Sequence, residues 1–294
     1  MSVEAPAVVV GTDGSSEALA AVRWAAAQAR LRGADLVIVH GYDEGWSADV
    51  HLPAPGFAEL AAGRAAEIAE DAELAARAVA PFITIRRRVD AGQPGPVLLR
   101  AARHAALVVV GNRGHGGFAG LLLGSVGHAV ATRAPCSVVV VRGEPDTLPG
   151  PVAVGVDGAA AGAVALECAF DQAAAEACPL EAIRAFLRPA PPWAADIAPS
   201  ILWLEQGLAQ ESRLLAELVR PMRLRYPQVK VEELVSRADA ARALVAASQR
   251  ARLVVVGSRG LGPVAGMLLG SVGLQLLHHA ACPVMIARGD VHRA

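Results

Sequence analysis

The sequence predicts an α/β protein made of two tandem copies of an open, doubly wound parallel sheet with helices on both faces. Short apolar runs alternate with longer segments of helical periodicity, which is typical of parallel strands joined by helical crossovers. The pattern then repeats, and Gly11-Thr12-Asp13-Gly14 is matched by Gly155-Val156-Asp157-Gly158. Because the halves align along their length, we expect a first domain at residues 1–143 and a second at 150–294.

The elements of the first copy follow from its apolar pattern. Buried strands are expected where short apolar runs end, and a strand with one solvated face is expected where apolar residues alternate with Thr84, Arg86 and Arg88. Helices are expected where apolar residues recur every three or four positions. The expected strands are residues 7–10, 36–39, 83–89, 107–110 and 137–141, and the expected helices are 16–32, 57–80, 94–105 and 125–133. Residues 41–56 show no periodicity and predict a loop.

Composition excludes several classes of protein. The chain has 27 basic and 28 acidic residues, so a broad basic surface for nucleic acid is not expected. No apolar run is long enough to cross a bilayer, and no positive region precedes the first apolar residues, so neither membrane insertion nor a secretory signal is expected. The cysteines form no CxxC pair, and we expect buried thiols in a reducing, cytoplasmic compartment. They are Cys136, Cys168, Cys178 and Cys282.

A glycine loop between a buried strand and a helix start is the strongest functional signal. Gly, two residues, Gly, nine residues and Gly-Ser occur at Gly111, Gly114 and Gly124-Ser125. The spacing recurs at Gly257, Gly260 and Gly270-Ser271. Such a loop exposes backbone N–H groups beside the positive end of a helix dipole, which favours an anion or a nucleotide. The alternative is that the glycines only make a tight turn.

The loop is not a P-loop. That design needs a lysine beside the Ser/Thr, whereas Leu123 and Leu269 precede the Gly-Ser pairs and Lys230 is the only lysine of the chain. Phosphate charge must then be met by backbone amides, the Ser125 hydroxyl, an arginine such as Arg113 and a divalent cation.

The loop spacing, the strand ends VVVGTDGSS and VAVGVDG, and the closing strands CSVVVVR and CPVMIAR resemble the universal stress protein family in its tandem, ATP-binding form. The resemblance covers essentially the whole chain. It implies a five-stranded parallel sheet of order 3-2-1-4-5 in each copy, with a ligand crevice between strands 1 and 4, where the order reverses. It also implies ATP and Mg²⁺ or Mn²⁺ as ligands.

The resemblance assigns a role to each matching residue. The first glycine and the Asp after strand 1 would lie by the ribose or its metal, the end of strand 2 by the adenine, and the glycine loop by the phosphates. Asp13 and Asp157 are the candidate metal ligands. In the first domain the implied site is Gly11, Asp13, Val39, His40, Gly111, Asn112, Arg113, Gly114, His115, Gly116, Gly117, Gly124, Ser125 and Val126. In the second it is Gly155, Asp157, Ile183, Arg184, Gly257, Ser258, Arg259, Gly260, Leu261, Gly262, Pro263, Gly270, Ser271, Val272 and Gly273.

The second copy departs from the first around its crevice. Ala159-Ala160 replace Ser15-Ser16, Arg184 replaces His40, and Pro263 removes an N–H donor from the loop. His115 and the paired Arg113 and Arg259 could approach phosphate, whereas the histidines of the last helices are expected to be structural. Those histidines are His128, His278 and His279.

The expected function is a regulatory ATP-binding protein with a role in stress or growth adaptation. Phosphoryl transfer needs a base or water-positioning group and strong charge neutralisation, which the loops do not offer, so at most slow ATP hydrolysis is expected. An ATPase or nucleotidyl transferase in the same pocket, and a non-binding interaction module, are the alternatives. A regulatory protein partner is expected, and a homodimer through the apolar strands 137–141 and 283–287.

Overall fold

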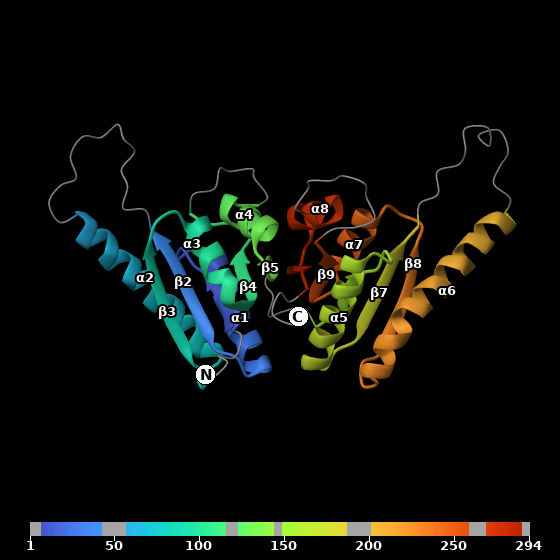
Figure 1. Cartoon of the computed structure of the whole chain (residues 1–294), viewed down its shortest axis with the longest axis horizontal. Coiled ribbons are helices and arrows are strands. Elements are labelled where there is room, and N and C mark those ends of the chain that lie inside the picture. Colours follow the sequence, from blue (N-terminus) through green and yellow to red (C-terminus); the bar gives the residue numbers. More distant parts are fainter. Residues whose placement is uncertain are drawn as a thin grey trace, which may run out of the picture. The chain divides into compact units, whose positions relative to one another are not determined.

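The computed structural model describes residues 7–42, 57–115, 123–143, 149–186, 201–258 and 269–289 (Figure 1). Contacts between residues divide the chain into two compact units, Met1–Thr147 together with Arg288–Ala294, and Leu148–Ala287. Among the described residues, no helix is both long and apolar enough to span a bilayer.

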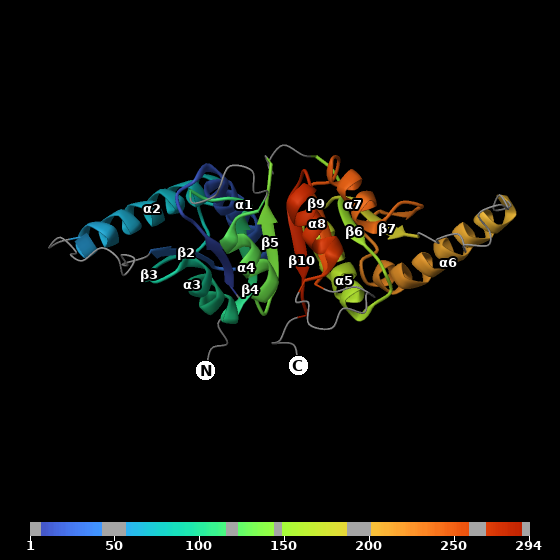
Figure 2. The same ribbon diagram turned by 90° about the horizontal axis from the view of Figure 1, so that it is seen from above.

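The first half is a five-stranded parallel sheet of order β3-β2-β1-β4-β5. Its strands are β1 (Ala7–Gly11), β2 (Leu36–Tyr42), β3 (Ile85–Ala91), β4 (Ala105–Gly111) and β5 (Ser137–Val141). Its helices are α1 (Ser16–Arg32), α2 (Phe57–Val79), α3 (Pro94–Ala101) and α4 (Ser125–Arg133). Helices α1 and α2 pack together on one face of this sheet and α3 and α4 on the other (Figure 2).

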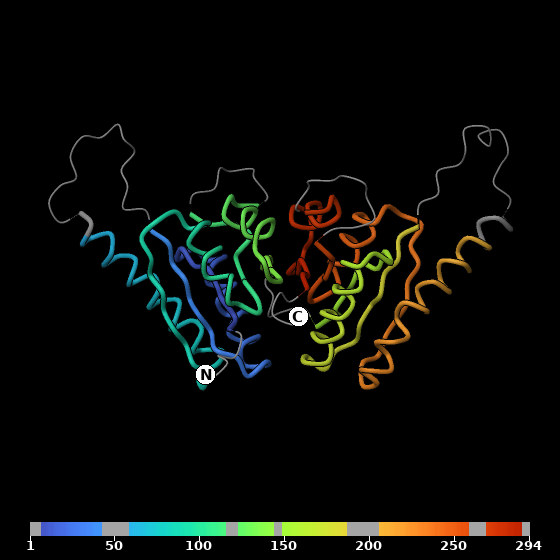
Figure 3. Tube along the Cα trace, in the orientation of Figure 1, coloured from blue at the N-terminus to red at the C-terminus, as the bar shows by residue number. Residues whose placement is uncertain are grey.

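The second half repeats this arrangement with the order β8-β7-β6-β9-β10. The Cα trace within each half follows the same path (Figure 3). Its strands are β6 (Val152–Gly155), β7 (Leu180–Ala185), β8 (Val231–Ser236), β9 (Leu253–Gly257) and β10 (Val284–Ala287). Its helices are α5 (Ala160–Ala175), α6 (Ile201–Arg225), α7 (Ala240–Ser248) and α8 (Ser271–His279). The predicted fold class and strand order are therefore confirmed.

Small residues build the core, as the composition indicates. The valines of β1 and β4 are buried, and the alanines on the inner side of α1 are buried too, which lets this helix approach the sheet closely. Helix α1 begins where the Ser15 side chain accepts a hydrogen bond from the Ala18 amide, and it ends at Gly33, whose φ of 60° is left-handed.

Several boundaries and one burial state differ from expectation. Strand β2 continues through Gly41 and Tyr42, which were expected in the loop, and β4 begins at Ala105, two residues earlier than expected. Helix α3 stops at Ala101, because the chain tightens into a 3₁₀ turn over Ala102–His104 before β4 begins. Strand β3 runs from Ile85 to Ala91, two residues later than the alternation predicts. No disulfide joins the four cysteines, all of which the structure describes; three are buried as expected, but Cys168 is only partly buried.

Candidate functional site

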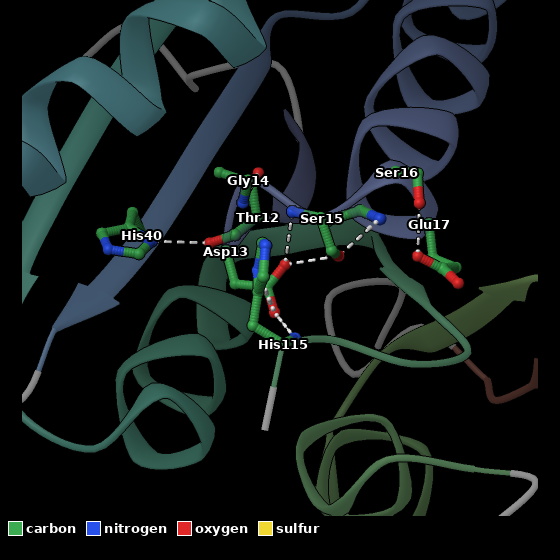
Figure 4. A network of polar contacts seen from close by, with 9 residues as sticks. Thr12, Asp13, Gly14, Ser15, Ser16, Glu17, His40 and His115 are labelled. Atoms are coloured by element: carbon green, nitrogen blue, oxygen red, sulfur yellow. Dashed lines mark hydrogen bonds and ion pairs between the residues drawn. The ribbon is translucent and has the colours of Figure 1, made fainter. Parts of the chain in front are cut away.

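The switch point of the first sheet brings Asp13 and the glycine loop together. Strand β1 pairs with β2 on one side and β4 on the other, so the segments after β1 and β4 leave the same edge of the sheet. The His115 amide donates to Asp13 Oδ2 at 2.9 Å, although the two residues are 102 positions apart (Figure 4). The predicted meeting of Asp13 with the start of the loop is thus present in the structure.

Asp13 is held as a carboxylate by its neighbours. Its Oδ1 accepts from the Ser15 amide at 3.0 Å and from the Ser15 hydroxyl at 2.6 Å. Burial alone would raise the Asp13 pKa, but the hydrogen bonds from Ser15 and from the His115 amide outweigh it and lower the pKa. The His115 ring nitrogen Nδ1 lies 3.7 Å from Oδ2. A charged, partly exposed carboxylate therefore lies at the carboxyl edge of the first sheet, beside the glycine loop.

His40 lies in β2, which flanks β1 on the side opposite β4. Its Nδ1 lies 2.7 Å from the carbonyl oxygen of Thr12, so this nitrogen carries the proton and donates (Figure 4). The imidazole is buried, with 7% of the residue exposed. The carbonyl of Val39 accepts from the Thr12 amide at 3.0 Å. Strand β2 is therefore joined, at Val39 and His40, to the residue just before Asp13.

The base of the glycine loop is built identically in the two halves. In the first, the Asn112 amide donates to the carbonyl of Val141 at 3.0 Å, and the Asn112 carbonyl accepts from the Gly124 amide at 2.8 Å. In the second, Ser258 makes the same two bonds with Ala287 and Gly270, at 3.2 and 2.9 Å. Both ends of each loop are thus anchored to the sheet.

The helices that follow the loops begin without a side-chain cap. Gly124 precedes α4 and Gly270 precedes α8, and neither helix start receives a hydrogen bond from a capping side chain. The first amides of these helices point out of the helix, as they do in any uncapped α-helix. Ser125 and Ser271 are exposed there, so each helix start offers a hydroxyl and N–H groups to an anion.

Several glycines of the motif serve packing as well as any ligand. A Cβ at Gly111 would lie 2.9 Å from the Glu17 carbonyl oxygen, and a Cβ at Gly257 would lie 2.6 Å from the Ala161 carbonyl oxygen. A Cβ at Gly114 would overlap Asp13 Oδ2. The tight-turn alternative therefore accounts for Gly111 and Gly257. Gly114, by contrast, lies directly against the Asp13 carboxylate, where no side chain fits.

The second crevice has a different polar arrangement. Asp157 Oδ1 accepts from the Ala159 amide at 2.9 Å, with no hydroxyl at position 159 to add a second bond. Arg184 Nε donates to Glu211 Oε2 at 2.6 Å, and its Nη1 donates to the Val156 carbonyl at 3.3 Å. Arg184 occupies the place that His40 holds in the first half.

Some predicted site residues lie outside the described part of the chain, and some residues near the site were not predicted. The predictions for Gly116, Gly117 and residues 259–263 fall outside the described residues. His128 and His279 are exposed, and the expectation that they are structural stays a prediction. Sequence reasoning missed Thr12, Ser15 and Glu211; the GTDGSS string signals the first two, but no local pattern signals Glu211.

A divalent cation fits the first crevice only together with a phosphate ligand. Among the residues that the structure describes, no three His, Cys, Asp or Glu side chains gather into a metal site. Magnesium, however, is commonly held by one or two carboxylates plus the phosphates of a nucleotide. Asp13 offers one such carboxylate, and Asp157 offers the corresponding one in the second half.

The fold defines a tandem α/β protein in which the strand order reverses between the first and fourth strands of each half. The chain belongs to the universal stress protein family, which it matches over residues 6–142 and 150–288. It is 36% identical to the universal stress protein Rv2623 of Mycobacterium tuberculosis over 295 aligned residues, covering 96% of each chain. It is 35% identical to a universal stress protein of Mycolicibacterium smegmatis over 289 residues, again covering 96% of each.

Solved structures agree with the fold. The crystal structure of a universal stress protein from Archaeoglobus fulgidus superposes with a TM-score of 0.68 at 20% identity, covering 97% of each chain. A universal stress protein in complex with cAMP is 35% identical and covers 47% of this chain and 97% of its own, with a TM-score of 0.37.

Proposed function

We propose that this chain is a regulatory protein that binds an adenine nucleotide, ATP with Mg²⁺ or Mn²⁺, at the carboxyl edge of its sheets. The observation that carries the proposal is the hydrogen bond from the His115 amide to Asp13, because it puts a glycine loop against a strand-end carboxylate. The uncapped start of α4 and the exposed Ser125 supply further donors for phosphate.

The charge balance of the crevice supports binding rather than fast catalysis. Neither glycine loop contains a lysine, and the chain's one lysine, Lys230, lies just before β8, so neither loop supplies an ammonium group to neutralise charge developing on a transferred phosphoryl group. The oxygens of Asp13 already accept three hydrogen bonds, which makes this carboxylate a weak base. We therefore expect ATP turnover well below about 1 per second, the lower end of kinase rates. Faster turnover would favour the ATPase alternative.

The biological setting belongs to the same proposal. A role in stress or growth adaptation, a cytoplasmic location, a homodimer and a regulatory protein partner are expected of a nucleotide-responsive binding protein. Under this proposal, nucleotide occupancy changes how the chain interacts with its partner.

Equilibrium dialysis with ATP and Mg²⁺ tests the binding site. Asp13→Ala removes the carboxylate beside the loop, and Gly114→Val places a side chain on top of it. We expect each variant to weaken ATP binding at least about tenfold, the effect of losing a charge-assisted contact. cAMP is the comparison ligand, because it carries base and ribose but a single phosphate.

The matched control is another glycine in the same half. A Cβ at Gly63, on the exposed side of α2, would meet nothing within 4 Å, so Gly63→Ala should bind ATP like the native chain. Unchanged affinity in both Asp13→Ala and Gly114→Val, with circular dichroism showing intact folds, would remove this site assignment.

A further inference from the structure

Val39 in β2 and Ile183 in β7 hold the same place in their halves. Val39 and Ile183 accept a backbone hydrogen bond from Thr12 and Val156, at 3.0 and 2.9 Å. The residue that follows each of them then donates from its side chain to the carbonyl of that same partner. His40 and Arg184 are therefore structurally equivalent, and each bonds to the residue just before the aspartate of its half, Asp13 or Asp157.

The two side chains fill this place very differently. The His40 ring bonds to Thr12 alone. The Arg184 guanidinium reaches the Val156 carbonyl, and its Nη1 lies 4.0 Å from where a Cβ on Gly158 would be. The guanidinium thus lies beside the residues on either side of Asp157. The nucleoside end of the second crevice would have to be at this place.

Glu211 holds the guanidinium there. The Arg184 and Glu211 side chains are 13% and 14% exposed, and Nε lies 2.6 Å from Oε2. Breaking a buried pair by moving one partner away leaves an uncompensated charge, which is strongly unfavourable. The pair is therefore a fixed part of the second half and not a side chain that swings aside for a ligand.

The first half has no counterpart of Glu211. Helices α2 and α6 end at Val79 and Arg225, and the fourteenth residue before each end is Ala65 and Glu211. Ala65 is buried and presents only a methyl group. A histidine at position 40 and an alanine at position 65 leave the first crevice without this barrier.

We infer that the Arg184–Glu211 pair closes the nucleoside end of the second crevice, so that each chain binds one nucleotide and binds it in the first half. This inference rests on the proposed function, since it names which of two similar crevices the nucleotide enters. The second half keeps the anchored loop base and the uncapped helix start but does not admit the base and ribose.

Isothermal titration calorimetry with ATP and Mg²⁺ measures the stoichiometry. The native chain should bind one ATP, and Asp13→Ala should weaken this single site at least about tenfold. Two sites in the native chain, or a site of native affinity remaining in Asp13→Ala, would overturn the inference while leaving nucleotide binding intact. No binding to the native chain would overturn both this inference and the proposed function.

A reciprocal exchange tests the pair itself. Arg184→His with Glu211→Ala should open the second half and raise the stoichiometry from one to two. His40→Arg with Ala65→Glu should transfer the barrier and lower the affinity of the first half at least tenfold. Thermal unfolding identifies any variant that has lost its fold. The double variant Arg184→His with Glu211→Ala is the decisive one, because it removes both charges of the pair. If it folds and still binds a single ATP, the pair is not what closes the second crevice.

Discussion

The Asp13 carboxylate joins three segments of the first half. It accepts from the amide and hydroxyl of Ser15 at the start of α1 and from the amide of His115 in the glycine loop. Ser15 in turn accepts from the Ala18 amide as the cap of α1. One side chain therefore couples the helix start, the strand end and the loop, and a nucleotide or metal that engages Asp13 must compete with these bonds.

This coupling predicts a pH dependence of stability. Because the folded-state pKa of Asp13 is lowered, its ionisation stabilises the fold above the unfolded pKa of about 4, and this contribution is lost as pH falls through the folded pKa. Urea unfolding of the native chain and of Asp13→Asn should therefore show a stability difference at pH 7 that shrinks in acid. A difference that stays constant down to pH 2 would contradict the coupling.

At the scale of elements, the approach of α1 to the end of β4 depends on a residue without a side chain. A Cβ at Gly111 would lie 2.9 Å from the Glu17 carbonyl oxygen and 3.0 Å from its carbon, and both atoms belong to the α1 backbone. Since backbone cannot rotate away as a side chain can, the helix itself would have to shift.

Gly111→Ala should therefore reduce the free energy of unfolding by about 1–3 kcal/mol, the usual cost of overpacking. Urea denaturation measures this. Gly63→Ala should instead raise stability by up to about 1 kcal/mol, because alanine is the better helix former. Equal effects of the two substitutions would show that the close approach has no energetic consequence.

Tyr226 fastens the end of α6 to α5 in the second half. Its hydroxyl donates to Asp171, and its ring lies 5.7 Å from that of Phe170, between centroids. Burial, and then the hydrogen bond to Asp171 and its negative charge, raise the pKa of Tyr226 to about 12.

A phenol with a raised pKa stabilises the fold below its unfolded pKa, and this stability is lost as pH rises from about 10 to about 12. The chain has two tyrosines, so Tyr42→Phe leaves Tyr226 as the sole phenol. Its ultraviolet titration should have a midpoint near 12. A midpoint near 10 would show that the bond to Asp171 does not form.

At the scale of the whole molecule, the repeated pattern was sufficient to predict the fold. Short apolar runs mark most of the strands and alternation marks β3, and the two parallel sheets follow from the succession of strands and helices. The meeting of Asp13 with the loop was equally predictable, because a switch point brings the segments after β1 and β4 together.

What could not be predicted depends on the position of one element against another. Glu211 reaches Arg184 because α6 presents that residue toward β7, and the sequence near either residue carries no sign of the pairing. The packing role of Gly111 is hidden for the same reason, since it depends on how closely α1 lies to β4. Local sequence patterns report periodicity and caps, whereas these contacts join residues far apart in the chain.

The central claim is that backbone amides, a hydroxyl and Asp13, without a lysine, hold a nucleotide in the first half. A crystal structure of the chain grown with ATP and Mg²⁺ tests it most directly. We predict phosphate oxygens within hydrogen-bonding distance of the Ser125 hydroxyl and the first amides of α4, with the ribose or the metal beside Asp13. A first crevice that stays empty at saturating ATP, with the His115 amide still bonded to Asp13, would contradict the account.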